Sequence, residues 1–89
     1  MPAKKSVKAP KPIGVVTHFY GGIGVAIIKF NKVVKRGLTV EFRGASTNFS
    51  QPIESMQYDH QEIAVAKKGQ EVGIKVSDKV REGDEVYEV

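Results

Sequence analysis

The 89-residue chain contains no cysteine and no tryptophan, and it has no long apolar run. Without cysteine, neither a disulfide framework nor a thiolate metal site can stabilise the fold. No window approaches the roughly 18–20 apolar residues of a membrane-spanning helix. Residues 1–11 carry lysines but no apolar core, so they differ from a secretory signal. These absences favour a single cytoplasmic domain, because so short a chain can bury only one core.

Motifs for catalysis and nucleotide binding are also missing. There is no Gly-x-x-x-x-Gly-Lys-Ser/Thr loop to cradle phosphates, and no Gly-x-Ser-x-Gly elbow to present a nucleophile. His18 falls in a β-like segment and His60 in a polar turn, where surface positions are expected. Asp59, His60 and Glu62 are close in sequence but too few for a metal centre. The prediction is a protein without catalytic residues, metal ion or cofactor, and without bound GTP.

Charge is unevenly distributed along the chain. The formal net charge of +4 comes from 14 basic and 10 acidic residues, and four of the bases lie near the N-terminus: Lys4, Lys5, Lys8 and Lys11. Residues 12–53 carry five bases against the single acid Glu41, whereas residues 54–89 carry nine acids against five bases. The acids closest to the C-terminus alternate through a turn and a strand, as on a solvated face: Glu82, Asp84, Glu85 and Glu88. A basic surface can therefore form on the first half of the folded body.

One seven-residue pattern occurs three times, at residues 34–40, 66–72 and 80–86. Each copy has a small apolar residue, a base, a charged residue, glycine, two further residues and valine. Because glycine adopts positive φ without steric penalty, it can turn the chain there. The valine then begins or continues a strand. We interpret the pattern as a charged turn that feeds a strand, used three times.

Short β-like segments separated by turn signals fill the body of the chain. They are residues 13–20, 23–30, 38–43, 49–58, 72–76 and 85–89. Gly21 and Gly22 indicate a hairpin between the first two. In the first segment, Ile13, Val15, Thr17 and Phe19 are expected on one face.

Further details of the strands can be predicted from their patterns. Leu38, Val40 and Phe42 are expected to face the core of their strand. Ile53 and Met56 cannot share one face of a regular strand, which predicts a bulge or bend between them. No segment shows a convincing helical period. We predict a basic N-terminal arm at residues 1–11 and, at residues 12–89, an all-β domain that forms a closed antiparallel barrel of about six strands.

The ordered set of motifs resembles the β-barrel second domain of translational GTPases. The resemblance rests on a first strand at 13–19 with the glycine turn after it, on the turn Val34–Gly37, on the segment 53–57 followed by 66–73, and on the closing segment 80–86. It implies a translation-factor barrel without its GTPase domain. Similar barrels occur at the C-terminal end of collagenase-like peptidases, where they are accessory. In elongation factors the barrel helps to hold the aminoacyl end of tRNA, but no contact residue matches here.

The basic residues of the first half are the candidate binding residues. They are Lys29, Lys32, Lys35, Arg36 and Arg43, with Tyr20, Phe30 and Phe42 nearby in sequence. Bases interleaved with aromatic rings can hold a phosphate backbone and stack on nucleobases. The competing interpretation is that the phenylalanines belong to the core and the bases only solubilise the surface. The tail lysines Lys4, Lys5, Lys8 and Lys11 would add phosphate contacts without sequence specificity.

Two functions follow from this sequence. In the first, a stand-alone translation-factor-like barrel binds RNA or the ribosome through the basic residues. In the second, the chain is a protein-interaction or accessory module that docks onto a separate enzyme or factor. The neutral charge of residues 12–89 and the missing nucleic-acid motifs support the second. A membrane partner is not expected.

Overall fold

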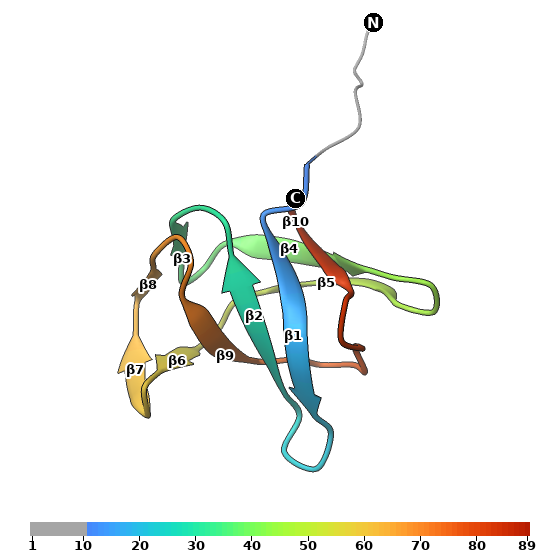
Figure 1. Ribbon diagram of the computed structural model, residues 1–89, viewed down its shortest axis with the longest axis horizontal. Coiled ribbons are helices and arrows are strands. Elements are labelled where there is room, and N and C mark those ends of the chain that lie inside the picture. The colour runs from blue at the N-terminus through green and yellow to red at the C-terminus, as the bar shows by residue number, and fades with distance from the viewer. Residues whose placement is uncertain (1–10) are drawn as a thin grey trace, which may run out of the picture.

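The computed structural model describes residues 11–89, which form strands and turns and contain no helix (Figure 1). The strands are β1 (Gly14–Tyr20), β2 (Val25–Phe30), β3 (Val34–Lys35), β4 (Thr39–Arg43), β5 (Asn48–Pro52), β6 (Met56–Tyr58), β7 (Gln61–Ile63), β8 (Val65–Ala66), β9 (Glu71–Lys75) and β10 (Glu85–Glu88). The all-β prediction is therefore confirmed for this part of the chain. Of the predicted basic arm, only Lys11 belongs to the described residues, and it is exposed. Lys4, Lys5 and Lys8 lie outside them.

One antiparallel sheet dominates the fold, with the strand order β5-β4-β10-β1-β2-β9-β6-β7, and β3 pairs separately with β8. The sheet curls into a half-barrel around the core (Figure 1). The predicted closed barrel of about six strands is wrong, because the end strands β5 and β7 do not pair within the described chain. Two local features explain the open edge: Pro52 lacks an N–H at the end of β5, and β7 is only three residues long.

A side chain bridges the gap that the open sheet leaves. The Gln51 amide nitrogen donates to the Lys75 carbonyl at 2.8 Å, and its amide oxygen accepts from the Ser77 N–H at 2.7 Å. These two bonds link the edge strand β5 to the end of β9, which lies five places away in the strand order. The Gln51 amide thus takes the place of backbone hydrogen bonds that paired strands would form there.

The three copies of the repeated pattern form the same turn. Gly37, Gly69 and Gly83 have φ of 97°, 85° and 93°, and each lies third in a turn closed by a backbone hydrogen bond. This is the geometry of type II turns, whose third residue needs positive φ. Each glycine N–H also donates at 2.8 Å to a distant carbonyl, that of Ile53, Phe30 and Val16 respectively. The predicted role of the glycines is confirmed.

The apolar ends of each copy anchor it in the core. The first residues are Val34, Ala66 and Val80, the last are Val40, Val72 and Val86, and all six are buried. Two copies also contact each other directly, since Val34 pairs with Ala66 between β3 and β8. Each copy therefore fastens one turn to the interior at both ends.

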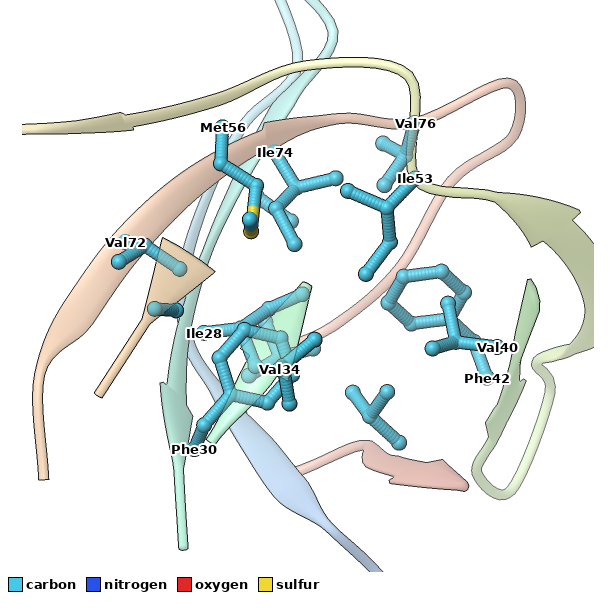
Figure 2. Packing of buried hydrophobic residues seen from close by; sticks show 14 of the residues in the cluster. Ile28, Phe30, Val34, Val40, Phe42, Ile53, Met56, Val72, Ile74 and Val76 are labelled. Atoms are coloured by element: carbon cyan, nitrogen blue, oxygen red, sulfur yellow. The ribbon is translucent and has the colours of Figure 1, made fainter. Parts of the chain in front are cut away.

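The core lies inside the curled sheet, where side chains from many strands converge (Figure 2). Phe30, Phe42, Ile53 and Met56 are at most 1% exposed. Gly14 permits this packing, because a Cβ there would lie 2.9 Å from the Phe30 ring and 3.0 Å from Ile28. The β1 backbone therefore lies directly against the Phe30 ring.

A bulge in β1 changes which residues face the core. The register of β1 against β2 shifts between Val16 and His18, and the Thr17 hydroxyl donates to the Ile27 carbonyl at 3.2 Å. Val16 is consequently buried, while Val15 is 36% exposed. The predicted common face of Ile13, Val15, Thr17 and Phe19 is wrong, because an extra residue reverses the alternation.

Other details of the strands agree with the sequence patterns. Val40 and Phe42 face the core, and Leu38 packs against it half-buried. The expected bend between Ile53 and Met56 is confirmed, since β5 ends at Pro52 and β6 starts at Met56 while both apolar side chains stay buried. Residues 11–89 contain no helix of the length and apolarity that crossing a membrane requires.

Candidate interaction surfaces

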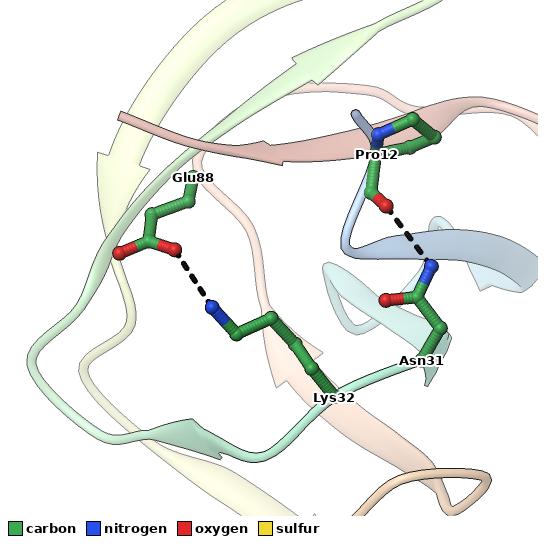
Figure 3. Close-up of polar contacts among 4 residues, drawn as sticks. All are labelled: Pro12, Asn31, Lys32 and Glu88. Atoms are coloured by element: carbon green, nitrogen blue, oxygen red, sulfur yellow. Dashed lines mark hydrogen bonds and ion pairs between the residues drawn. The ribbon is translucent and has the colours of Figure 1, made fainter. Parts of the chain in front are cut away.

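Three of the five predicted binding bases form ion pairs with carboxylates. Figure 3 shows the pair of Lys32 and Glu88. In this pair, Lys32 Nζ lies 3.0 Å from Glu88 Oε1. The other two pairs are Arg36 Nη1–Glu62 Oε2 at 3.8 Å and Arg43 Nη2–Glu41 Oε1 at 2.8 Å. All the side chains concerned are partly exposed, so each pair contributes little to stability, roughly 0–1 kcal/mol. The pairs do, however, reduce the positive potential of this region.

The aromatic residues of the predicted binding set are separated from the bases. Phe30 and Phe42 are buried and have no free face for a nucleobase. Tyr20 is exposed but ends β1 opposite Val25, whereas Lys29 pairs with Val15 at the other end of the hairpin. Lys35 is exposed in β3. The structure therefore does not bring bases and open rings together as the sequence suggested.

Arg43 instead takes part in a small polar group on β4 and β10. Its guanidinium lies 4.6 Å from the centre of the Tyr87 ring. The Tyr87 hydroxyl donates to Glu85 Oε1 at 2.7 Å. This hydrogen bond is the main reason that the pKa of Tyr87 is raised, because the bond holds the phenol in its protonated form. Arg43 opposes the shift.

Lys29 borders a shallow, mostly apolar pocket of about 300 Å³, together with Pro12, Gly14, Lys68 and Glu85. The Asn31 amide donates to the Pro12 carbonyl at 2.9 Å and fixes one wall (Figure 3). The pocket has no aromatic ring open to a base, because Phe30 turns into the core.

The titratable residues singled out in the sequence do not assemble into a catalytic or metal site within residues 11–89. His18 Nδ1 lies 3.4 Å from Glu82, and the His18 ring stacks near Tyr20 with centroids 6.3 Å apart. No group of three or more carboxylate or imidazole ligands gathers in the described part, so Asp59, His60 and Glu62 form no metal centre there.

Asp84 does not lie on the expected solvated face. It is 6% exposed, and its Oδ2 accepts from the Arg81 N–H at 2.9 Å, which caps the third copy of the repeated turn. A Cβ at Gly44 would collide with the Asp84 carboxylate. Gly44 therefore leaves room for an acidic side chain that serves the fold. The other acids of this cluster, Glu82, Glu85 and Glu88, are exposed as predicted.

A hollow lies on the outer face of the sheet, over β1, β2, β9 and β6. Its floor is formed by Val25, Ile27 and Gly73, and Gln57 lies beside Gly73 across the ladder. Its rim carries Tyr20 and Ile23 from the β1–β2 hairpin, the turn residues Asp59 and His60, and Glu71. The hollow, here called the outer groove, measures about 260 Å³. Sequence reasoning missed it, although Gly73, which stands between the buried residues Val72 and Ile74, could have indicated it.

Gly73 has no structural requirement to be glycine. Its φ is not positive, and a Cβ there would meet Val25 and Ile27 only at 3.4 and 3.5 Å, which is ordinary van der Waals contact. Glycine inside a strand destabilises it by roughly 0.5–1 kcal/mol relative to alanine. Such a glycine commonly marks a place where a ligand or another backbone comes close. Its absent side chain keeps the floor of the outer groove low.

The turn at the other rim is strained. Asp59 and His60 have φ of 54° and 64°, and they form the two-residue loop between β6 and β7, which pairs Tyr58 with Gln61. Such loops prefer Asn-Gly, because both central residues need positive φ. A non-glycine residue in this conformation costs up to roughly 1–2 kcal/mol, and aspartate and histidine adopt it more readily than other side chains do. Because this loop is Asp-His and not a glycine-containing pair, the sequence pattern did not predict the hairpin.

Comparisons with known proteins point to peptidases. An uncharacterized protease of Methanocaldococcus jannaschii is 41% identical over 76 residues, which are 84% of this chain and 19% of that protein. The chain therefore spans about a fifth of its curated relative. No protein-family model matches the chain.

The solved structures that resemble this chain also come from a peptidase. Crystal structures of the C-terminal domain of a putative U32 peptidase from Geobacillus thermoleovorans, native and as a selenomethionine variant, superpose with a TM-score of 0.83 at 25% identity. They cover 94% and 88% of this chain, respectively, and 99% of each matched chain is covered. The predicted kinship with the second domain of translational GTPases is wrong, and so is the RNA- or ribosome-binding function derived from it. The chain is similar to the C-terminal domain of U32 peptidases.

Proposed function

We propose that this chain is a protease-associated accessory domain, which works beside the catalytic part of a peptidase and supplies no catalytic group. The observation that carries the proposal is the match to the C-terminal domain of a putative U32 peptidase, 99% of which is covered. The relative from Methanocaldococcus jannaschii supports it, because most of that protease lies outside the matched region.

The chemistry of the described residues fits an accessory role. His18 contacts Glu82 and Tyr20, and neither histidine hydrogen-bonds a serine or threonine hydroxyl in residues 11–89. A nucleophile needs such a neighbouring base to become reactive. The exposed apolar residues around the outer groove are features of a binding surface.

The proposal can be tested with the Methanocaldococcus jannaschii protease and a library of quenched fluorescent peptides. Three proteins are compared: the full-length protease, the protease without its 76 matched residues, and a fusion that carries the present chain in their place. We expect the truncation to slow cleavage and the fusion to restore it. A fusion to an unrelated β-domain of similar size is the control. Undiminished cleavage by the truncated protease, or cleavage by the isolated chain, would refute the proposal.

A further inference from the structure

We infer that the outer groove binds an extended segment of substrate polypeptide and seats one of its apolar side chains, flanked by a basic residue. The inference rests on the proposed function and specifies which surface the accessory domain offers and to what chemistry. Nothing in the comparisons assigns a role to this face.

The fold does not require the glycine that lies at the floor of the groove. His18, Ile27, Gly73 and Gln57 are neighbours across β1, β2, β9 and β6, so Gly73 lies in the middle of a continuous outer face. Neither φ nor crowding requires glycine there. The glycine instead lowers the surface between Ile27 and Gln57, where a side chain from outside can enter.

Exposed apolar side chains surround this low point. Ile23 is 68% exposed and Tyr20 is 51% exposed, although both are large apolar residues. Tyrosine is among the residues that carry much of the energy in interfaces. The groove, at about 260 Å³, is smaller than the ~300–1,000 Å³ of pockets that hold small-molecule ligands. A single side chain of a polypeptide therefore suits it better than a cofactor.

The charged residues at the rim of the groove favour a polypeptide that has a basic residue next to its apolar side chain. Asp59 and Glu71 line the groove, and neither forms an ion pair within residues 11–89. The lining contains no lysine or arginine. Lys29 and Lys75 occupy adjoining positions of the same face, opposite Glu71 and Val25, but lie beyond the lining. Glu71 faces Lys29 across the β2–β9 ladder, so the Asp59 carboxylate is the one that disfavours a phosphate backbone and favours a peptide with lysine or arginine beside its apolar residue.

The turn Asp59-His60, which has positive φ at both residues, stands at the rim of the outer groove. Strained backbone of this kind concentrates at sites that bind ligands.

The test uses the full chain and three labelled glycine–serine peptides, followed by fluorescence anisotropy at low salt. The first peptide carries a phenylalanine between two lysines. The second peptide carries a phenylalanine between two glutamates, and the third peptide carries a serine between two lysines. We expect the first to bind most tightly, and raised salt to weaken its binding. Its addition should shift the amide resonances of Ile27 and Gly73 in ¹⁵N-resolved NMR spectra and leave that of Gly44 unchanged.

Gly73→Val is the decisive variant, because it places a side chain on the floor of the groove at a position where φ is not positive and a Cβ makes only ordinary contacts. We expect at least a ten-fold loss of affinity for the first peptide, with an unchanged circular dichroism spectrum. Ile23→Ser should weaken binding as well, and Val33→Ser, at a residue 53% exposed outside the groove, is the matched control. Unchanged binding by Gly73→Val, or equal binding of the glutamate peptide, would overturn the inference.

A further experiment distinguishes a failure of this inference from a failure of the proposed accessory role. Gly73→Val is introduced into the protease fusion described above. If the fusion still restores cleavage of lysine- and phenylalanine-containing peptides at the wild-type rate, the groove is not the substrate surface, although the accessory role stands. If the isolated chain binds the catalytic part of the protease and Gly73→Val abolishes that complex, the groove is a domain interface and the inference is wrong.

Discussion

Replacing the repeated turn glycines by L-alanine or by D-alanine should separate a requirement for positive φ from a requirement for space. Gly37, Gly69 and Gly83 have φ between 85° and 97°, and a Cβ at any of them would meet no atom within 4 Å. Their need for glycine is therefore conformational. An L-residue with left-handed backbone is destabilised by roughly 1–2 kcal/mol, whereas a D-residue is suited to it.

The comparison of the two enantiomers removes the contribution of the unfolded state. Alanine of either hand restricts the unfolded chain, which stabilises the fold by ≈ 0.4–1 kcal/mol. Gly83→Ala with L-alanine should thus lower the free energy of unfolding by about 1 kcal/mol, and D-alanine should raise it by about half as much. For a domain of this size, 1 kcal/mol corresponds to roughly 4–8 °C in Tm.

The variants can be made by chemical synthesis, and their unfolding in urea can be followed by circular dichroism. Gly22 is the matched control, because a Cβ there would also meet nothing within 4 Å but its φ is not positive. At Gly22 the order of the two enantiomers should reverse. If D-alanine and L-alanine at Gly83 destabilise the fold equally, the glycine is required for a reason other than φ, and the account of the three turns fails.

Three further results are expected. Gly14→Ala should destabilise the fold by about 1–3 kcal/mol in urea unfolding, because the new methyl group would press on the Phe30 ring; an unchanged midpoint would show that β1 can move away. Gln51→Ala should lower stability by about 1–2 kcal/mol through loss of its two bonds to the β9 end, and equal stability would mean that water replaces the bridge. The Tyr87 phenol should titrate above its ordinary pKa of 10.0 in ultraviolet absorbance at alkaline pH, and Glu85→Gln should lower that pKa. Because the folded-state pKa is raised, the stabilisation that this phenol contributes is present below pH 10 and is lost as the pH rises through the folded value.

The sequence predicted those parts of the fold that depend on local pattern. Strict alternation placed Val40 and Phe42 inside, and the three turn glycines were correctly assigned, because φ preference is a property of the residue itself. The β6–β7 hairpin was missed because its turn is Asp59-His60 rather than a glycine-containing pair. The bulge at Thr17 was missed because nothing in a β-branched run shows where one residue is extra.

The candidate sites were less predictable, because they depend on which distant residues become neighbours. The sequence predicted that Lys32 binds phosphate. In the fold, its ammonium group lies 3.0 Å from the carboxylate of Glu88, which is 56 positions later in the chain. Phe30 and Phe42 could equally have been binding rings or core residues, and only burial decided. The outer groove joins residues from four strands. Its one sequence signal is a glycine between two buried apolar residues.

The sequence alone determined that this chain is an all-β domain with three glycine turns. It did so because alternation and positive φ are local properties of side chain and backbone. Only the tertiary structure decided that the sheet stays open, that Gln51 bridges the gap, that the bases pair with carboxylates and that apolar residues gather around Gly73. These outcomes depend on strand order and register, which are set when residues far apart in sequence bury their apolar faces together.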